Sequence, residues 1–148
     1  MDDFASRIFG SPRALQLPPK GVRLSQGQTG WAFLRNGHKA AIQSPISGKV
    51  VSLNKSALED PRICHEDPYA GGWVMRVDPS SLKLDLQALY YGEECYQWME
   101  TENQRLHELL GPEYEQLAST GAQPVDDLYG SIPDLSWESL TQTLLRTR

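Results

Sequence analysis

The pattern of hydrophobic and polar positions in the first half of the chain predicts short strands and turns. The segment Arg35-Asn36-Gly37-His38 lies between two apolar runs, over residues 31–34 and 40–42. Asn-Gly between two such runs is the strongest short-range signal of a β-hairpin, because both central residues of a type I′ turn need a positive φ. Residues 31–43 are therefore predicted to form a hairpin with Asn36 and Gly37 at its tip.

Further strands are predicted on both sides of this hairpin. Val22 and Leu24 alternate with polar residues, a strand follows Gly48 over residues 49–53, and another over 73–77 places apolar side chains on one face. Residues 54–72 are rich in Pro, Gly, Asp and Asn and are predicted to form a long loop. Loops of this length in compact domains are usually functional or well packed.

After Pro79 the pattern becomes helical. A short helix is predicted within residues 80–92, and a longer one over 93–110 whose apolar stripe comprises Tyr96, Met99, Leu106 and Leu110. Gly111-Pro112 is a typical helix stop. Residues 112–133 are predicted to form a loop, broken by Gly and Pro.

The end of the chain carries one more predicted helix. Ser136 can cap it, and Trp137, Leu140 and Leu144 form its apolar stripe. A helix this short is unstable alone in water, so the stripe must pack on a folded surface. Trp137, Leu140 and Leu144 are therefore predicted to bind either the body of the chain or a partner protein.

Charge divides the chain unevenly. Residues 1–92 hold 11 Lys and Arg against 8 Asp and Glu, a net charge of +3, whereas residues 93–148 hold 3 against 11, a net charge of −8. The sequence contains no basic stripe with interleaved aromatic residues, so nucleic acid is not an expected partner. Together with the helix stop, this favours a domain over residues 1–110 and an acidic helical extension over 111–148.

Membrane segments and cysteine chemistry are not indicated. No run of 18 or more apolar residues occurs, and the first ten residues lack the layout of a secretory signal, so a soluble cytoplasmic protein is expected. Cys64 and Cys95 lie outside any Cys-x-x-Cys pair, which predicts neither a disulfide framework nor a zinc site.

Other candidate chemistry is weak. Cys64-His65-Glu66-Asp67 brings together a nucleophile, a base and acids, but neighbouring residues on an extended loop point apart. A metal bound by His38, His65 and Asp67 lacks the usual paired ligand spacing. No catalytic residue, metal ligand or enzyme activity is assigned.

Three segments, "LPPKGVRLSQGQ", "SPISGKVVSLN" and "EDPYAGGWVMRV", resemble in this order the glycine cleavage system H protein family. With "DFASRIFG" near the start, the resemblance covers roughly residues 3–110. It implies a mostly β fold with C-terminal α-helices, namely the barrel-sandwich hybrid of lipoyl and biotinyl carriers.

The resemblance also implies a cofactor position at the hairpin tip. In that family the tip reads Glu-Ser-x-Lys-Ala, and its lysine carries a lipoyl group in amide linkage. Counting back from Ser44 without gaps places the first four of these residues on 34–37, so Gly37 occupies the lysine position. Lys39 is the nearest lysine, roughly 7 Å further along the strand. No cofactor is therefore expected, with lipoate on Lys39 as the alternative.

The family has two or three further strands before the segment that matches Asp3-Phe4-Ala5. Their absence here predicts an unpaired sheet edge and an exposed apolar face. This edge is expected to be covered by residues 111–148, by a partner protein or by a second copy in a homodimer.

Three functions therefore compete. The first is a non-catalytic binding or accessory module without a lipoyl arm, which works within or regulates a lipoate-linked or redox enzyme assembly. The second is an active lipoyl carrier of a glycine cleavage-type system that uses Lys39. The third is an enzyme whose active site cannot be recognised from the sequence.

Overall fold

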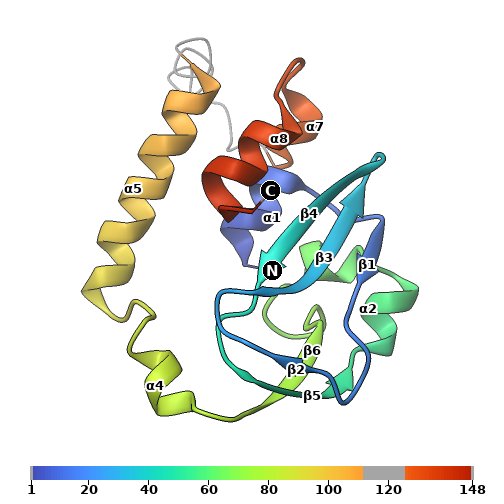
Figure 1. Ribbon diagram of the computed structural model, residues 1–148. Helices are drawn as coiled ribbons and strands as arrows, with labels where there is room; N and C mark the ends of the chain where they lie inside the picture. The colour runs from blue at the N-terminus through green and yellow to red at the C-terminus, as the bar shows by residue number, and fades with distance from the viewer. Residues whose placement is uncertain (1, 112–125, 148) are drawn as a thin grey trace.

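The computed structural model describes residues 2–111 and 126–147, and its strands form two separate three-stranded antiparallel sheets. One sheet has the order β1-β3-β4 and the other β2-β5-β6. The strands are β1 (Ala14–Gln16), β2 (Arg23–Leu24), β3 (Thr29–Arg35), β4 (His38–Gln43), β5 (Gly48–Leu53) and β6 (Met75–Pro79). In the described residues the sheets do not close into a barrel (Figure 1).

Helices hold more of the described residues than the strands do. They are α1 (Asp3–Phe9), α2 (Lys55–Glu59), α3 (Ile63–Glu66), α4 (Leu82–Leu86), α5 (Glu93–Leu110), α7 (Leu128–Ser131), α8 (Trp137–Leu140) and the π-helical turn η1 (Thr141–Leu145). The expectation of a mostly β chain is therefore only partly correct. The two antiparallel sheets are present, but helices at both ends complete the fold.

The predicted strands lie close to their expected places. The hairpin forms from β3 and β4, β5 follows Gly48, and β6 starts two residues later than predicted. Gly48 is required where it stands, because a Cβ atom there would lie 2.3 Å from the carbonyl oxygen of Asp78 on β6. The turn before Gly48 is held by the buried Asp85 of α4, whose carboxylate accepts hydrogen bonds from the backbone N–H and the hydroxyl of Ser47, at 2.7 and 3.2 Å.

Local capping explains two of the helix boundaries. Ser136 precedes α8, and its hydroxyl accepts a hydrogen bond from the N–H of Ser139, as predicted. α5 ends at Leu110 before Gly111, which has a φ of 72°. Tyr96 is the exception on the predicted stripe of α5, because it is 78% exposed whereas Leu106 is buried.

The predicted long loop over residues 54–72 contains the two short helices α2 and α3. Helices of five and four residues show too little periodicity to be recognised in a sequence rich in turn residues. Of the loop predicted over 112–133, residues 112–125 lie outside the described residues, and α7 forms within the remainder.

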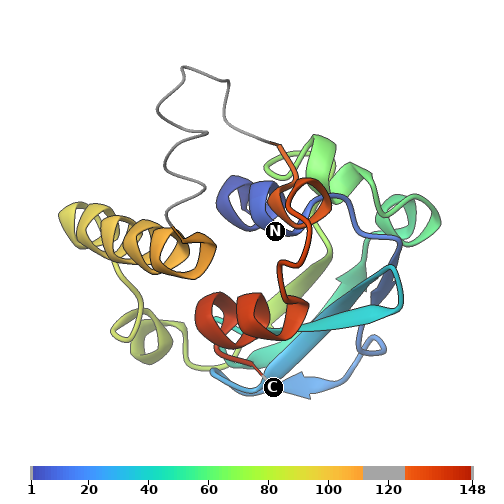
Figure 2. The ribbon, with the colours of Figure 1, turned by 90° about the horizontal axis from the view of Figure 1, so that it is seen from above.

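The core lies between the hairpin and helices from both ends of the chain. Its centre is aromatic: Trp137 of α8 makes edge-to-face contacts with Phe9 of α1 and Phe33 of β3, at centroid distances of 5.3 and 5.8 Å. Both phenylalanines are fully buried. Figures 1 and 2 both show α1, α7 and α8 gathered beside β3 and β4. The described part of the extension therefore packs on the body of its own chain.

α5 is joined to the C-terminal turn through a buried carboxylate. Glu102 is 1% exposed, and its Oε1 accepts hydrogen bonds from Arg105 of the same helix and from Arg146, which follows η1, the latter at 2.9 Å. Figure 2 shows α5 along one side of the molecule, next to this C-terminal segment. Arg146 therefore connects the C-terminal segment to a neighbouring helix. None of the helices in the described ranges is long and apolar enough to cross a membrane.

Candidate functional site

The tip of the β3–β4 hairpin is a two-residue turn. Arg35 pairs with His38 across the strands, which leaves Asn36 and Gly37 between them. Their φ angles are 50° and 83°. Two successive positive φ angles are those of a type I′ turn, so the prediction from Asn-Gly is confirmed.

Gly37 lies at the outermost point of this turn, in open space. A Cβ atom added to it would have no neighbour within 4 Å outside its adjoining residues. A larger side chain is therefore opposed only by the positive φ, not by packing. As it stands, the tip has no side-chain nucleophile at position 37.

This geometry predicts how the tip responds to substitution. Gly37→Val is expected to lower the free energy of unfolding by roughly 1–2 kcal/mol, because a β-branched residue is strained at this φ. Lys39→Ala, at an exposed position, is the matched control and is expected to leave it unchanged. Urea denaturation measures both variants. Equal stability of Gly37→Val and wild type would contradict the assigned turn.

Aromatic side chains hold the hairpin strands next to the turn. His38 stacks on Trp137 at a centroid distance of 5.7 Å, and the edge of Tyr129 meets Trp137 at 4.8 Å. The indole Nε1–H of Trp137 donates a hydrogen bond of 3.0 Å to the carbonyl oxygen of Lys39. The hairpin is therefore fixed to the C-terminal helices on one face.

An ion pair fixes the same hairpin from its first strand. Both terminal nitrogens of Arg35 donate to the carboxylate of Asp127, at 2.5 Å each, and Arg35 also donates to the carbonyl oxygen of Phe9. Burial tends to raise the pKa of Asp127, but hydrogen bonds from Arg35 and from the N–H of Gly130 outweigh it, so the pKa lies below its ordinary value. Asp127 is thus held as a carboxylate beside the hairpin.

Comparison with known proteins identifies the family. The model of the glycine cleavage H-protein family matches residues 1–102. The chain belongs to this family. A glycine cleavage system H protein of Carboxydothermus hydrogenoformans is 30% identical over 102 residues, which cover 69% of this chain and 78% of the relative. One from Coprothermobacter proteolyticus is 34% identical over 66% of this chain and 76% of the relative.

A solved structure of this family has a similar fold. The H protein of Mycobacterium marinum superimposes with a TM-score of 0.52 at 29% identity, over 54% of this chain and 63% of that chain. The family membership predicted from the sequence motifs is therefore confirmed. The two antiparallel sheets correspond to the family fold, without a closed barrel in the residues described.

The sequence assigned the lysine position of H proteins to Gly37, and Gly37 lies at the hairpin tip. Lys39 is the second residue of β4, pairs with Leu34, and has an exposed side chain. Its carbonyl oxygen accepts a hydrogen bond from Trp137, so the backbone at Lys39 is held in place while the side chain extends into solvent. Lipoylation of Lys39 stays a prediction.

The remaining predicted candidates do not form a catalytic centre. Cys64 lies on α3 and is buried, and burial raises the pKa of its thiol, which disfavours the reactive thiolate. Nε2 of His65 lies 3.5 Å from a carboxylate oxygen of Asp126. Within residues 2–111 and 126–147, no group of three or more His, Cys, Asp or Glu could hold a metal ion.

The proposed partner-binding stripe lies within the chain. Trp137 is 5% exposed, Leu140 is fully buried, and Leu144 is partly buried against the same core. Trp137 and Leu140 therefore pack against this chain's own hairpin and α1, where a second protein cannot reach them. The sequence is compatible with both an internal and an external surface for this stripe.

Asp127 and Tyr129 support the hairpin but were not recognised in the sequence. Asp127 lies 92 positions from Arg35 along the chain, and nothing in its neighbourhood indicates that partner. The one feature in the sequence that could have indicated an ion pair is Arg35, next to the turn. A guanidinium that becomes partly buried requires a carboxylate partner from another part of the chain.

Proposed function

We propose that this chain is an H-protein-type binding module whose hairpin tip carries no lipoyl arm. The observation that carries the proposal is Gly37, which stands at the outermost point of the tip where the family resemblance places the modified lysine. A glycine offers no amine for an amide bond. The protein would then act through contacts of its surface rather than by carrying a substrate.

The partners expected for such a module are enzymes of a glycine cleavage-type system or of another lipoate-linked or redox assembly. The hairpin is the natural docking element, because Trp137, Tyr129 and the Arg35–Asp127 pair hold the strands next to its turn in one conformation. A preformed ridge loses little conformational entropy on binding. The homodimer suggested by the sequence stays a prediction.

A second candidate is an active lipoyl carrier that uses Lys39. The comparisons by themselves favour it, because the relatives described above are named as H proteins and none is named as an accessory protein. The exposed side chain of Lys39 also leaves its amine accessible. Against it stands the position of Lys39, roughly 7 Å along the strand from the tip.

Intact-mass spectrometry of the protein from its own host, supplied with lipoate, distinguishes the two candidates. The armless module predicts the mass of the unmodified chain. An added lipoyl group that disappears in Lys39→Arg would overturn it in favour of the carrier. The variant Gly37→Lys is the positive control, because its lipoylation would demonstrate that the attaching enzyme recognises this hairpin.

A further inference from the structure

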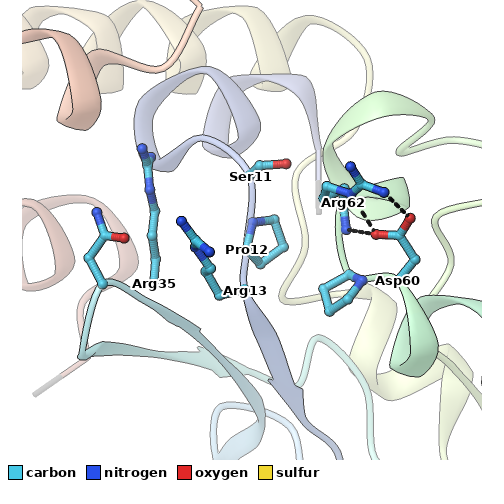
Figure 3. A pocket seen from close by; sticks show the side chains of 8 residues that line it. Ser11, Pro12, Arg13, Arg35, Asp60 and Arg62 are labelled. Atoms are coloured by element: carbon cyan, nitrogen blue, oxygen red, sulfur yellow. Dashed lines mark hydrogen bonds and ion pairs between the residues drawn. The ribbon is translucent and has the colours of Figure 1, made fainter.

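A hollow of about 490 Å³ lies next to the hairpin tip and is rich in arginine. It lies between the start of β1, the end of β3 and the segment that joins α2 to α3. Figure 3 shows Arg13 and Arg35 on one side of it and Arg62 with Asp60 on the other, with Ser11 and Pro12 between them. Cavities of 300–1,000 Å³ are the usual size of small-molecule sites.

The arginines on the first side are close neighbours with the same charge. Arg13 directly precedes Ala14, which pairs across the strands with Leu34, the residue before Arg35. Like charges at neighbouring cross-strand positions destabilise a sheet. Asp127 neutralises Arg35, whereas the side chain of Arg13 has no hydrogen bond or ion pair within the described ranges. The strand pairing therefore leaves one uncompensated guanidinium facing the hollow.

The arginine on the second side already has a carboxylate partner, although the pair lies in solvent. Two guanidinium nitrogens of Arg62 donate to the two carboxylate oxygens of Asp60, at 2.8 and 2.7 Å, and the side chains are 67% and 52% exposed. An anion in the hollow therefore competes with Asp60 for Arg62, and salt and water screen this exposed pair. Ser11 and Asn36 add a hydroxyl and an amide to the lining.

We propose that this hollow binds a small molecule through a phosphate or carboxylate group, with Arg13 as the principal contact and Arg62 as the second. Guanidinium groups bind both oxyanions through paired, charge-assisted hydrogen bonds. The site is independent of whether the chain carries a lipoyl arm, because none of its side chains belongs to the attachment position. Its place beside Asn36 puts a bound ligand next to the hairpin tip.

The test is a titration of the full-length ¹⁵N-labelled protein with pyrophosphate and, separately, with succinate, followed by NMR. Saturable shifts of the backbone amides of Arg13, Asn36 and Arg62 are expected with at least one of the two. The probe that binds identifies the preferred group. Binding should also weaken as sodium chloride is added, because salt screens the contact.

Three variants make the result specific. Arg13→Gln is expected to weaken binding by about tenfold, since it removes a charged hydrogen-bond donor. Asp60→Asn is expected to strengthen binding by about threefold, because it releases Arg62 from a competing carboxylate. Arg23→Gln, at an exposed position on β2, is the control and should bind as wild type does.

The gain expected from Asp60→Asn supports the site, because damage to the fold would not produce it, and the absence of a gain would exclude Arg62 as the second contact. The proposal is overturned if neither probe gives saturable shifts at these amides. It is equally overturned if Arg13→Gln binds as tightly as wild type, or no more weakly than Arg23→Gln.

Discussion

Trp137→Ala is expected to lower the free energy of unfolding by roughly 3–5 kcal/mol, the range for removal of a large buried aromatic side chain. The indole ring contacts Phe9, Phe33, His38 and Tyr129, and its Nε1–H binds the carbonyl oxygen of Lys39. The substitution removes all five interactions and leaves a cavity between the hairpin and α1. Urea denaturation followed by circular dichroism measures the loss.

The matched control is Trp98→Ala. Trp98 lies on α5, is only partly buried, and stacks on Tyr90 at a centroid distance of 6.3 Å. Its loss should cost about 1 kcal/mol, because it removes one ring pair and little buried area. Equal destabilisation by the two variants would mean that α8 does not belong to the core of the folded chain.

Asp127→Ala is expected to cost about 2 kcal/mol. It leaves the guanidinium of Arg35, whose side chain is 12% exposed, without its carboxylate. Breaking a fully buried pair typically costs roughly 3–5 kcal/mol, and the value here is smaller because the side chain of Asp127 is 32% exposed. Asp2→Ala, which removes an exposed cap of α1, serves as a control with a smaller expected effect.

The same pair makes stability depend on pH in acid. The pKa of Asp127 is lower in the folded than in the unfolded chain, so the unfolded chain binds more protons between the two values and stability rises with pH there. The contribution is complete above the ordinary pKa of 3.8 and is lost as the pH falls through the folded-state pKa. In Asp127→Asn this part of the pH profile should be absent. An unchanged profile would exclude Asp127 as the titrating group.

Five of the six strands were predictable because their signals are local, whereas β1 was not predicted. Asn36-Gly37 specifies the turn through two positive φ angles, and the apolar runs on either side specify the paired strands. Ser136 was recognisable as a cap for the same reason. The assignment of Gly37 to the family's attachment position rests on a gap-free count back from Ser44 and stays a prediction.

The packing of the core was less predictable, because its contacts join distant parts of the chain. Nothing in the sequence around Trp137 distinguishes an internal from an external surface for its stripe. α1 was not predicted as a helix, although Asp2 caps it and Phe9 is fully buried at its end. The arginine hollow combines positions 13, 35 and 62, and no local pattern connects them.

The aromatic centre of the core has a consequence for synthesis on the ribosome. Phe9 and Phe33 are made early, but their cover, Trp137, follows Phe33 by about 100 residues, which takes about 5–20 s at 5–20 residues per second. Throughout that interval Phe9 and Phe33 lack the cover that Trp137 gives them in the folded chain. Chaperone binding to the unfinished polypeptide should therefore centre on the first 35 residues and cease once α8 has left the ribosome.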